Sequence, residues 1–290
     1  MKNIKDLNVR DPFILLDDGK YYLYKTLRNR FGEWIKGVEV LISDDLENFS
    51  DPIPAFVPDD DFWGIRDFWA PEVKKYNGKY YMFVSHDYTS KDEGYLHGVS
   101  ISVADKPIGP FKPLINDMIT PRGWDCIDGS MFVDDDGQVY LYFVRQWPAL
   151  YDGQMYAAKL SPDLKKIIGE PQLIFTAKDS IYSHIVQNGP YFGYVTDGPF
   201  VIKYKGLYLL TWSTFNTFHN YVISLATSTT PIGQFNCKYP PLFTDNGGHS
   251  MIFKDKDEKL KIVFHSPNQP AGKERMHILD FEELLKGVKI

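Results

Sequence analysis

The sequence is poor in cysteine and in long hydrophobic runs. Cys126 and Cys237 are the only cysteines among 290 residues, and they form no C-x-x-C pair. A disulfide framework or a cysteine zinc site is therefore not expected. No apolar run reaches the roughly 20 residues of a membrane span, and the N-terminal M-K-N-I is not a secretory signal. We expect a cytoplasmic protein, although a secreted protein with its signal removed would begin in the same way.

The sequence also lacks a block of positive charge. It contains 32 Lys and Arg against 38 Asp and Glu, a formal net charge of −6. This balance argues against nucleic acid or an anionic membrane as the partner. Aromatic residues, in contrast, make up 16% of the chain. They suit strands packed face to face, and a handful of them are candidates for stacking against sugar rings.

One strand-turn-strand pattern recurs five times along the chain. Each copy has an acidic or polar residue at a tight turn, then an apolar strand, a turn, and a second strand, usually rich in aromatic residues. The copies are Arg10–Thr26, Ala70–Ser85, Asp128–Arg145, Val195–Ser213 and Gly248–Ser266. Taking Asp11, Pro71, Asp128, Asp197 and His249 as anchors, subtraction gives spacings of 60, 57, 69 and 52 residues. Short strands repeating at a period of about 50 residues predict a β-propeller.

Further strands complete each repeat. Third strands are expected at Gly37–Ser43, Gly98–Val103, Gln154–Leu160, Tyr221–Thr227 and Arg275–Leu279, and fourth strands at Pro54–Val57, Lys112–Ile115, Gln172–Thr176 and Pro241–Thr244. Phe281–Lys286 has the pattern of a short helical turn. We predict an all-β fold, a single five-bladed propeller over residues 1–290. A closed ring must protect its last edge, so Lys2–Asn8 is expected near the end of the chain.

Strand direction predicts a site on one face of this propeller. The starts of the inner strands would form a circle of Asp11, Trp69, Asp128, Asp197 and His249, and around it would lie Thr26, His86, Arg145, Thr214, Ser266 and Arg275. Each aspartate taken alone fits an Asx-turn equally well. Three carboxylates around one opening disfavour folding, because like charges raise one another's pKa. They suit glycoside hydrolysis, in which an acid protonates the leaving oxygen and a base activates water.

Five motifs together resemble glycoside hydrolase family 43, the five-bladed propellers that act on arabinan and xylan. They are R-D-P-F-I at 10–14, W-A-P-E at 69–72 followed by N-G-K-Y-Y, I-D-G-S-M-F-V-D-D-D-G at 127–137, D-G-P-F at 197–200 and G-G-H-S at 247–250. The resemblance covers essentially the whole chain in order. It implies that Asp11 is the general base, that Asp128 tunes the pKa of the acid and orients it, and that Asp197 is the general acid of an inverting reaction.

The resemblance extends to the surroundings of the carboxylates. It implies that Trp69 forms an aromatic wall of the sugar pocket, with a core tryptophan as the competing interpretation. It implies that His249 contacts a calcium or sodium ion in the channel, with a simple hydrogen-bonded histidine as the alternative; no cofactor is otherwise expected. We also expect His86, Arg145 and Arg275 to bind substrate, Arg275 through a sugar hydroxyl or Asp128, although most lone arginines are surface ions.

One position departs from the family pattern. The family usually has Glu before G-P, where this chain has Asp197. Its side chain is shorter by about 1.5 Å, one C–C bond, and a misplacement of about 1 Å can cost about a hundredfold in rate. The favoured hypothesis is an exo-acting hydrolase that releases α-L-arabinofuranose or β-D-xylose from plant-type oligosaccharides. The alternatives are a β-D-galactofuranosidase and a carbohydrate-binding propeller with weak or lost catalysis.

Overall fold

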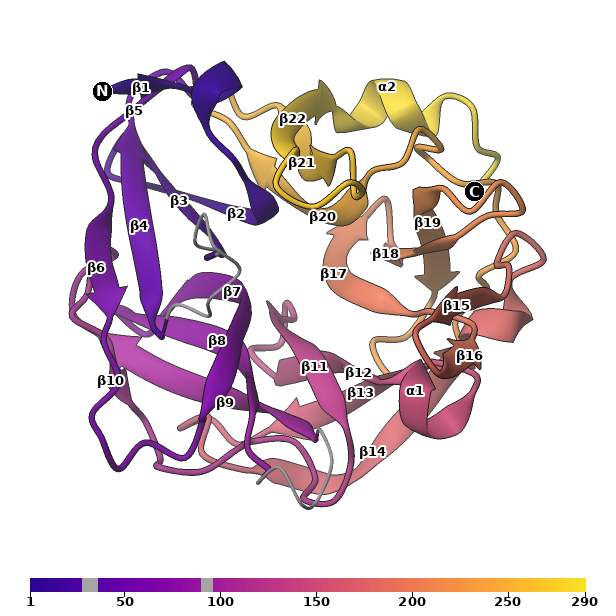
Figure 1. Cartoon of the computed structure of the whole chain (residues 1–290), viewed down its shortest axis with the longest axis horizontal. Coiled ribbons are helices and arrows are strands. Elements are labelled where there is room, and N and C mark those ends of the chain that lie inside the picture. Colours follow the sequence, from indigo (N-terminus) through magenta and orange to yellow (C-terminus); the bar gives the residue numbers. More distant parts are fainter. Residues whose placement is uncertain (28–35, 90–95) are drawn as a thin grey trace.

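The computed structural model describes residues 1–27, 36–89 and 96–290. Five antiparallel sheets surround a central axis as the blades of a propeller, in chain order around the ring (Figure 1). The predicted all-β, five-bladed fold is confirmed. None of the helices in the described residues is long and apolar enough to cross a membrane.

The first three blades each have four main strands. Blade 1 contains β2 (Arg10–Asp17), β3 (Lys20–Thr26), β4 (Val38–Ser43) and β6 (Ile53–Phe56), with the short β1 (Lys2–Asn3) and β5 (Asn48–Phe49) at its edge. Blade 2 contains β7 (Arg66–Tyr76), β8 (Lys79–Asp87), β9 (His97–Ala104) and β10 (Lys112–Pro113). Blade 3 contains β11 (Cys126–Val133), β12 (Val139–Arg145), β13 (Gln154–Leu160) and β14 (Ile167–Thr176).

The last two blades have three strands each in the described residues. Blade 4 contains β17 (Asp197–Tyr204), β18 (Leu207–Phe215) and β19 (Tyr221–Ser228); blade 5 contains β20 (Gly248–Lys254), β21 (Leu260–Ser266) and β22 (Arg275–Asp280), followed by α2 (Phe281–Leu285). The fourth strand predicted at Pro241–Thr244 is wrong. This stretch makes only an isolated bridge between Ile223 and Phe243, because Pro240 and Pro241 have no N–H to donate to a ladder.

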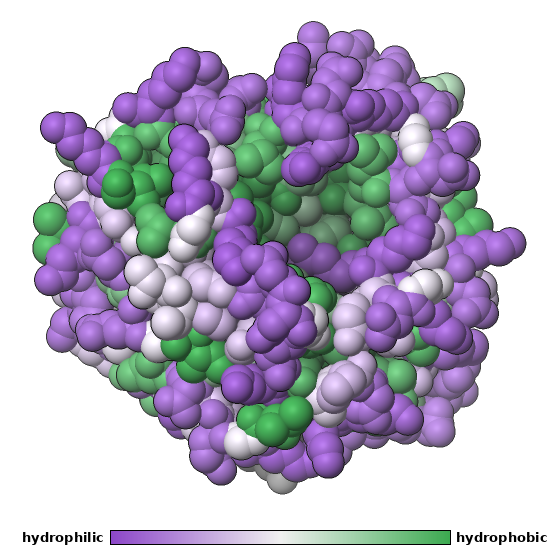
Figure 2. All heavy atoms as spheres, turned by 180° about the vertical axis from the view of Figure 1, so that it is seen from behind, coloured by the Kyte–Doolittle hydropathy of each residue, from purple (hydrophilic) through white to green (hydrophobic). Residues whose placement is uncertain are grey.

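The core lies between the blades, where the aromatic residues of facing sheets pack together. The largest fully buried side chains include Trp212, Tyr24, Tyr142, Phe83 and Phe264. Both cysteines are buried free thiols. One face of the molecule is hollowed near its centre, with hydrophobic atoms inside the hollow and mostly hydrophilic residues around it (Figure 2).

The N-terminal segment covers the edge of blade 5, as predicted. The backbone N–H of Val9 donates to the carbonyl of Glu274 at 3.2 Å. Nε of Arg275 donates to the carbonyl of Lys5 at 3.1 Å, beside the short η1 turn (Ile4–Asp6). The start and end of the chain are thereby joined, which closes the ring without a strand shared between them.

Segments outside the blade strands, between β12 and β17, form an addition that the repeat pattern did not predict. It comprises α1 (Trp147–Leu150), the η2 turn (Ala177–Asp179) and a hairpin of β15 (Val186–Asn188) and β16 (Tyr191–Gly193). The hairpin forms a two-stranded sheet of its own. These residues account for the longest spacing between the repeats.

Candidate active site

Every inner strand has a β-bulge near its start, and this bulge positions the site. At equivalent positions of the five blades, one bulge residue has a left-handed φ: Asp11 at 50°, Ala70 at 47°, Asp128 at 57°, Gly198 at 53° and His249 at 54°. Blade 2 has a second such residue, Asp67, in an earlier bulge of β7. A bulge turns its side chain away from the regular alternation of the strand. Asp11, Asp128 and His249 project from this position, whereas Asp197 comes from the residue before it.

Two of the five predicted anchors are therefore one residue out of place. Pro71 cannot be the equivalent of Asp11, because its ring holds φ near −65°, and Ala70 takes the position instead. In blade 4 the equivalent residue is Gly198. Asp197 corresponds to Trp69 in blade 2 and to Arg10 in blade 1. All three residues come just before the bulge, and each pairs with a residue of the second strand.

The bulges are fixed by side chains from the preceding blade. In blade 1, the N–H of Asp11 donates to Nδ1 of His265 at 3.2 Å. In the other three blades of this kind, the N–H donates to a hydroxyl oxygen at 2.8 Å. The pairs are Ala70 with Thr26, Asp128 with Ser85, and His249 with Ser213. Each accepting side chain lies on a second strand, opposite the residue before the bulge.

Blade 4 departs from this pattern in a way that involves the site. The corresponding residue of blade 3 is Val144, which pairs with Ile127 and has no side-chain acceptor. The N–H of Gly198 instead donates to Oδ2 of Asp128 at 2.8 Å. The carboxylate of Asp128 thus takes the role that a hydroxyl or imidazole has in the other blades, and this bond fixes its orientation.

The outer circle predicted from the sequence is off by one residue in four blades. The side chains that face the bulges are Thr26, Ser85, Val144, Ser213 and His265, rather than Thr26, His86, Arg145, Thr214 and Ser266. Because successive side chains of a strand point to opposite faces, a shift of one residue reverses the direction of each side chain.

Three of the predicted substrate-binding residues do not join the carboxylates, and the shift accounts for two of them, His86 and Arg145. His86 is fully buried, with Nε2 2.8 Å from Oγ of Ser100 and its ring 4.4 Å from that of Phe68. The guanidinium of Arg145 lies 4.2 Å from the centre of the Trp124 ring. That of Arg275 donates to the backbone carbonyls of Lys5 and Glu274 at 3.1 and 2.9 Å, which ties down the N-terminal segment.

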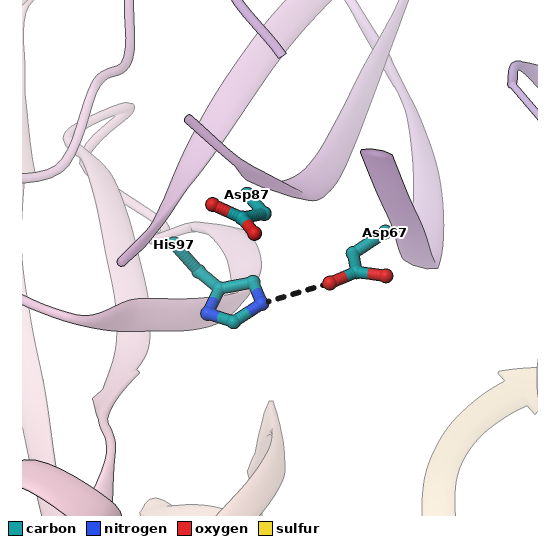
Figure 3. A group of neighbouring side chains, drawn as sticks. All are labelled: Asp67, Asp87 and His97. Atoms are coloured by element: carbon teal, nitrogen blue, oxygen red, sulfur yellow. Dashed lines mark hydrogen bonds and ion pairs between the residues drawn. The ribbon is translucent and has the colours of Figure 1, made fainter. Parts of the chain in front are cut away.

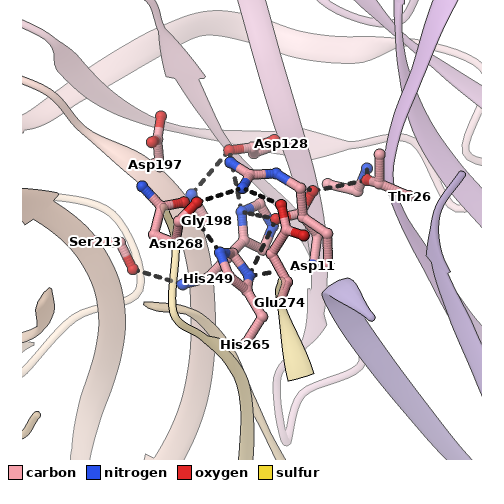
Figure 4. A network of polar contacts seen from close by, with 12 residues as sticks. Asp11, Thr26, Asp128, Asp197, Gly198, Ser213, His249, His265, Asn268 and Glu274 are labelled. Carbon is pink, nitrogen blue, oxygen red and sulfur yellow. Dashed lines mark hydrogen bonds and ion pairs between the residues drawn. The ribbon is translucent and has the colours of Figure 1, made fainter. Parts of the chain in front are cut away.

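The predicted carboxylates gather around His249 (Figure 4). Nδ1 of His249 lies 3.4 Å from Oδ1 of Asp11 and 4.0 Å from Oδ2 of Asp128. Asp11 also accepts a hydrogen bond from Oγ1 of Thr26 at 2.7 Å. Asp197, which is more exposed than Asp11 and Asp128, accepts a hydrogen bond from the Tyr221 hydroxyl at 3.0 Å.

Asp11 is held in its ionised form. Burial alone would raise its pKa, but the charges of His249 and Arg10 and the Thr26 hydrogen bond hold the pKa of Asp11 well below its usual range. For His249, burial disfavours the charged ring and lowers the pKa. The charges of Asp11, Asp128 and Asp197 outweigh burial and raise the pKa of His249. At the centre of the site, the Asp11 carboxylate thus lies beside a histidine whose charged form is favoured by its neighbours.

Asp197 is shifted in the opposite direction. Burial, followed by the negative charge of Asp128, raises the pKa of Asp197 to about 8. Burial also raises the pKa of Asp128. The site thus contains one carboxyl group that stays ionised and another that keeps its proton near neutrality, both close to the same histidine. This is the arrangement that acid–base hydrolysis requires.

Several residues of the site were missed in the sequence. Tyr221 and His265 had no local signal, because they reach Asp197 and Asp11 from strands that are distant in the sequence. Arg10 stands in the R-D-P-F-I motif, which was a usable signal. Glu72 stands in the W-A-P-E motif, which was a usable signal. It is half-buried and accepts a hydrogen bond from Oγ of Ser130 at 2.9 Å, and burial raises its pKa to about 7.

Trp69 packs on a charged histidine. The Trp69 and His97 rings are stacked, with centres 4.9 Å apart and planes at 23°. Nδ1 of His97 lies 2.9 Å from Oδ1 of Asp125. Its Nε2 lies 3.3 Å from Oδ2 of Asp67 (Figure 3). Although burial disfavours the charged ring, these two carboxylates raise the pKa of His97 to about 9.

One group among the described residues has the spacing of metal ligands. The ligand atoms of Asp67, Asp87 and His97 all lie within 4.8 Å of one another (Figure 3). Protein cations already compensate these carboxylates, since Nε of Arg66 donates to Asp87 at 2.7 Å and His97 pairs with Asp67. A metal ion would have to compete with Arg66 and with the imidazole proton.

Two carboxyl groups of opposite pKa shift at the centre of a propeller are the groups that glycoside hydrolysis requires. The chain belongs to the glycosyl hydrolases family 43, whose model matches residues 2–282. The protein is a glycosidase. The motifs that resembled this family in the sequence are thereby confirmed as a family assignment, and an oligosaccharide is the corresponding class of substrate.

Three similar proteins place the chain within this family. The solved structure of an endo-arabinase from Bacteroides thetaiotaomicron VPI-5482 is 37% identical, with a TM-score of 0.89 over 96% of each chain. A xylosidase/arabinosidase from Bacteroides ovatus is 27% identical over 78% of this chain and 75% of its own length. The β-D-galactofuranosidase xynD of Aspergillus niger is 26% identical over 93% of this chain and 78% of its own length.

Proposed function

We propose that the protein is an inverting, exo-acting glycosidase that releases terminal α-L-arabinofuranose or β-D-xylose from plant-type oligosaccharides. Asp11 is the general base, Asp197 the general acid and Asp128 the residue that tunes Asp197. The observation that carries this proposal is the opposite shift of the Asp11 and Asp197 pKa values around His249. The xylosidase/arabinosidase similarity supports the choice of sugars.

The proposed reaction needs only water and these three carboxyl groups. Asp11 accepts a proton from a water molecule as its oxygen attacks the anomeric carbon. The bond from that carbon to the glycosidic oxygen breaks, and the oxygen takes the proton of Asp197. The two carboxyl groups finish with exchanged protonation states, which solvent resets. Asp128, fixed by the Gly198 N–H, keeps its negative charge directed at Asp197 and so keeps the acid protonated.

A panel of 4-nitrophenyl glycosides tests the substrate. We expect turnover of the α-L-arabinofuranoside or the β-D-xyloside, and a loss of about 100- to 10,000-fold in Asp11→Asn, the usual contribution of a general base. Near-ultraviolet circular dichroism of the variant should match the wild type. Undiminished turnover in a folded Asp11→Asn protein would exclude Asp11 as the base.

β-D-Galactofuranoside is the second candidate substrate, favoured by the similarity to the xynD enzyme over most of both chains. The same panel separates it from the first candidate, because the 4-nitrophenyl β-D-galactofuranoside would then be turned over fastest. Neither assignment changes the proposed roles of the three aspartates.

The effect of the shorter Asp197 side chain can be tested separately. If Asp197 is too short for full activity, Asp197→Glu should raise kcat while sugar binding by calorimetry stays constant. A fall in kcat for this variant would mean that the site has adjusted to aspartate. A wild-type protein that binds arabinose or xylose but hydrolyses nothing in the panel would instead favour the carbohydrate-binding alternative.

We propose that no cofactor takes part in the chemistry. A calcium or sodium ion beside His249 would add positive charge where the imidazolium already lies between Asp11 and Asp128, so its contribution would be structural. Dialysis against EDTA should lower the melting temperature if calcium is bound, and should leave the pH profile of kcat/KM in place.

A further inference from the structure

A cavity of about 460 Å³ opens beside Asp197, and most of its wall lies outside the repeated strands. Arg10, Asp197 and Tyr221 form the part nearest to the acid. The β15–β16 hairpin contributes Gln187 and Asn188, and the turn after β18 contributes His219. Cavities of this size accept drug-sized ligands, so this cavity has room for more than a single functional group of a sugar.

The position of the cavity beside Asp197 indicates which side of the scissile bond it would bind. Among the described residues that line it, Asp197 is the single carboxylate, and neither Asp11 nor Asp128 is part of the wall. A general acid must lie within hydrogen-bond reach of the oxygen that leaves. If Asp197 is the acid, as proposed above, the leaving group extends into this cavity.

The chemistry of the wall fits a neutral saccharide. Amide side chains from Gln187, Asn188 and Gln269 can each donate and accept hydrogen bonds, which matches sugar hydroxyls. Among the described residues of the wall, Arg10 is the single Lys or Arg, and it is already paired with Glu274 at 3.4 Å and with Asp11 at 3.7 Å. These residues therefore present no unpaired Lys or Arg to select an acidic or phosphorylated sugar.

Exposed aromatic rings continue this surface beyond the cavity. Phe192 is 52% exposed and pairs across the hairpin with Gln187, and Tyr191 is 45% exposed and pairs with Asn188. Phe218, next to His219, is 82% exposed. Large exposed aromatic side chains beside a polar cavity mark a contact surface, and their flat faces suit the apolar faces of sugar rings.

The hairpin is held firmly enough to serve as a wall. Tyr194 exchanges backbone hydrogen bonds of 2.8 Å with Gly153 and with Tyr151, and the Tyr191 ring meets the Trp147 ring edge-on at 6.5 Å. On its other side, the N–H of His184 donates to the carbonyl of Phe215 at 2.7 Å. The hairpin thus bridges α1 and the end of β18.

We propose that this cavity, with the aromatic surface beside it, binds the leaving-group side of the substrate, and that it selects neutral oligosaccharides whose leaving part has at least two sugar units. The inference rests on the proposed function of Asp197. It assigns to the β15–β16 hairpin the role of a specificity element, with Gln187 and Asn188 as its hydrogen-bonding residues.

The test compares two substrates that share the released sugar but differ in the leaving group. These are the 4-nitrophenyl glycoside turned over in the panel and the corresponding linear trisaccharide. For Gln187→Ala and Asn188→Ala, kcat/KM should fall about three- to tenfold further on the trisaccharide than on the nitrophenyl glycoside, the effect of one lost hydrogen bond. Phe218→Ala should act in the same direction.

Gln172→Ala is the matched control. Gln172 is an exposed glutamine of β14 whose side chain donates to the carbonyl two residues earlier at 3.1 Å, much as Gln187 donates to the carbonyl of Gly189 at 3.2 Å. This control should behave as the wild type on both substrates. Equal losses on both substrates in the hairpin variants, or no loss, would overturn the inference while leaving the glycosidase proposal intact.

A binding measurement covers the case in which the wild type hydrolyses neither substrate. The proposed function would then fail, and calorimetric titration with arabinotriose and xylotriose would still decide the inference. Binding that is weakened in Asn188→Ala supports the cavity as a saccharide site. Binding that is unchanged in this variant, or absent from the wild type, rules the cavity out.

Discussion

The hydroxyl of Tyr221 donates a hydrogen bond to Oδ2 of Asp197 at 3.0 Å. A donor to a carboxylate favours the ionised form, so this bond lowers a pKa that burial and the charge of Asp128 have raised to about 8. Tyr221→Phe keeps the ring, which stacks on His265 at 5.9 Å, and removes only the donor. The pKa of Asp197 should rise further, and the alkaline limb of the kcat/KM profile should move to higher pH.

Tyr208→Phe provides the control for this variant. The Tyr208 hydroxyl also bonds an aspartate, Asp134, but at the far end of β11. Its loss should leave the alkaline limb in place. An alkaline limb that stays still or moves to lower pH in Tyr221→Phe would contradict the role given to this hydrogen bond.

Thr26 connects Asp11 to the neighbouring blade. Its hydroxyl donates to Oδ2 of Asp11 at 2.7 Å and accepts the N–H of Ala70 at 2.8 Å. In Thr26→Val the Asp11 carboxylate loses a donor, so its pKa should rise and the acidic limb of kcat/KM should move to higher pH. The unpaired N–H of Ala70 should cost about 1–3 kcal/mol of the free energy of unfolding.

Thr26→Ser retains the hydroxyl and should restore both properties. Urea denaturation and a pH series on the nitrophenyl substrate measure them. A Thr26→Val protein with the wild-type acidic limb would show that this hydrogen bond does not control Asp11.

Asp197 makes the protein less stable at neutral pH. Its carboxyl has a pKa of about 8 in the folded state against the ordinary 3.8. Between these values the folded chain binds a proton that the unfolded chain has lost, so the free energy of unfolding falls as pH rises from about 4 to about 8. Asp197→Asn cannot ionise, and its melting temperature should exceed that of the wild type increasingly over this window.

The comparison of melting temperatures needs only a buffer series. Below about pH 4 the difference between the two proteins should become small, because the wild-type carboxyl is then protonated in both states. A difference that is constant from pH 4 to pH 8 would mean that the shifted pKa does not belong to Asp197.

The sequence was sufficient to predict the blades but not the direction of every side chain. Repeated strands with period-two alternation predicted the inner, second and third strands to within about one or two residues, except that β7 begins at Arg66 and not at Ala70. The β-bulges interrupt that alternation, and a bulge leaves no reliable mark in a single sequence. The one-residue error at Pro71 and the reversed side chains of His86 and Arg145 both follow from the bulges.

The missed residues share a different cause. His265 and Ser213 reach the site across the boundary between two blades, and Tyr221 reaches Asp197 from the third strand of the same blade. The partners in these pairs are far apart in the chain. The hydrogen bond from Gly198 to Asp128 spans 70 residues and depends on Val144 having no acceptor. Only the packed blades reveal these contacts.

The central claim is that Asp197 donates the proton to the leaving oxygen. The most direct measurement is kcat/KM of Asp197→Asn on two glycosides of the same sugar, one with a sugar leaving group and one with 2,4-dinitrophenol, with Asp11→Asn as the comparison. An activated phenol leaves without protonation, so Asp197→Asn should lose about 100-fold or more on the saccharide and far less on the dinitrophenyl glycoside, whereas Asp11→Asn should be impaired on both. Equal losses on both substrates in Asp197→Asn would contradict its role as the acid.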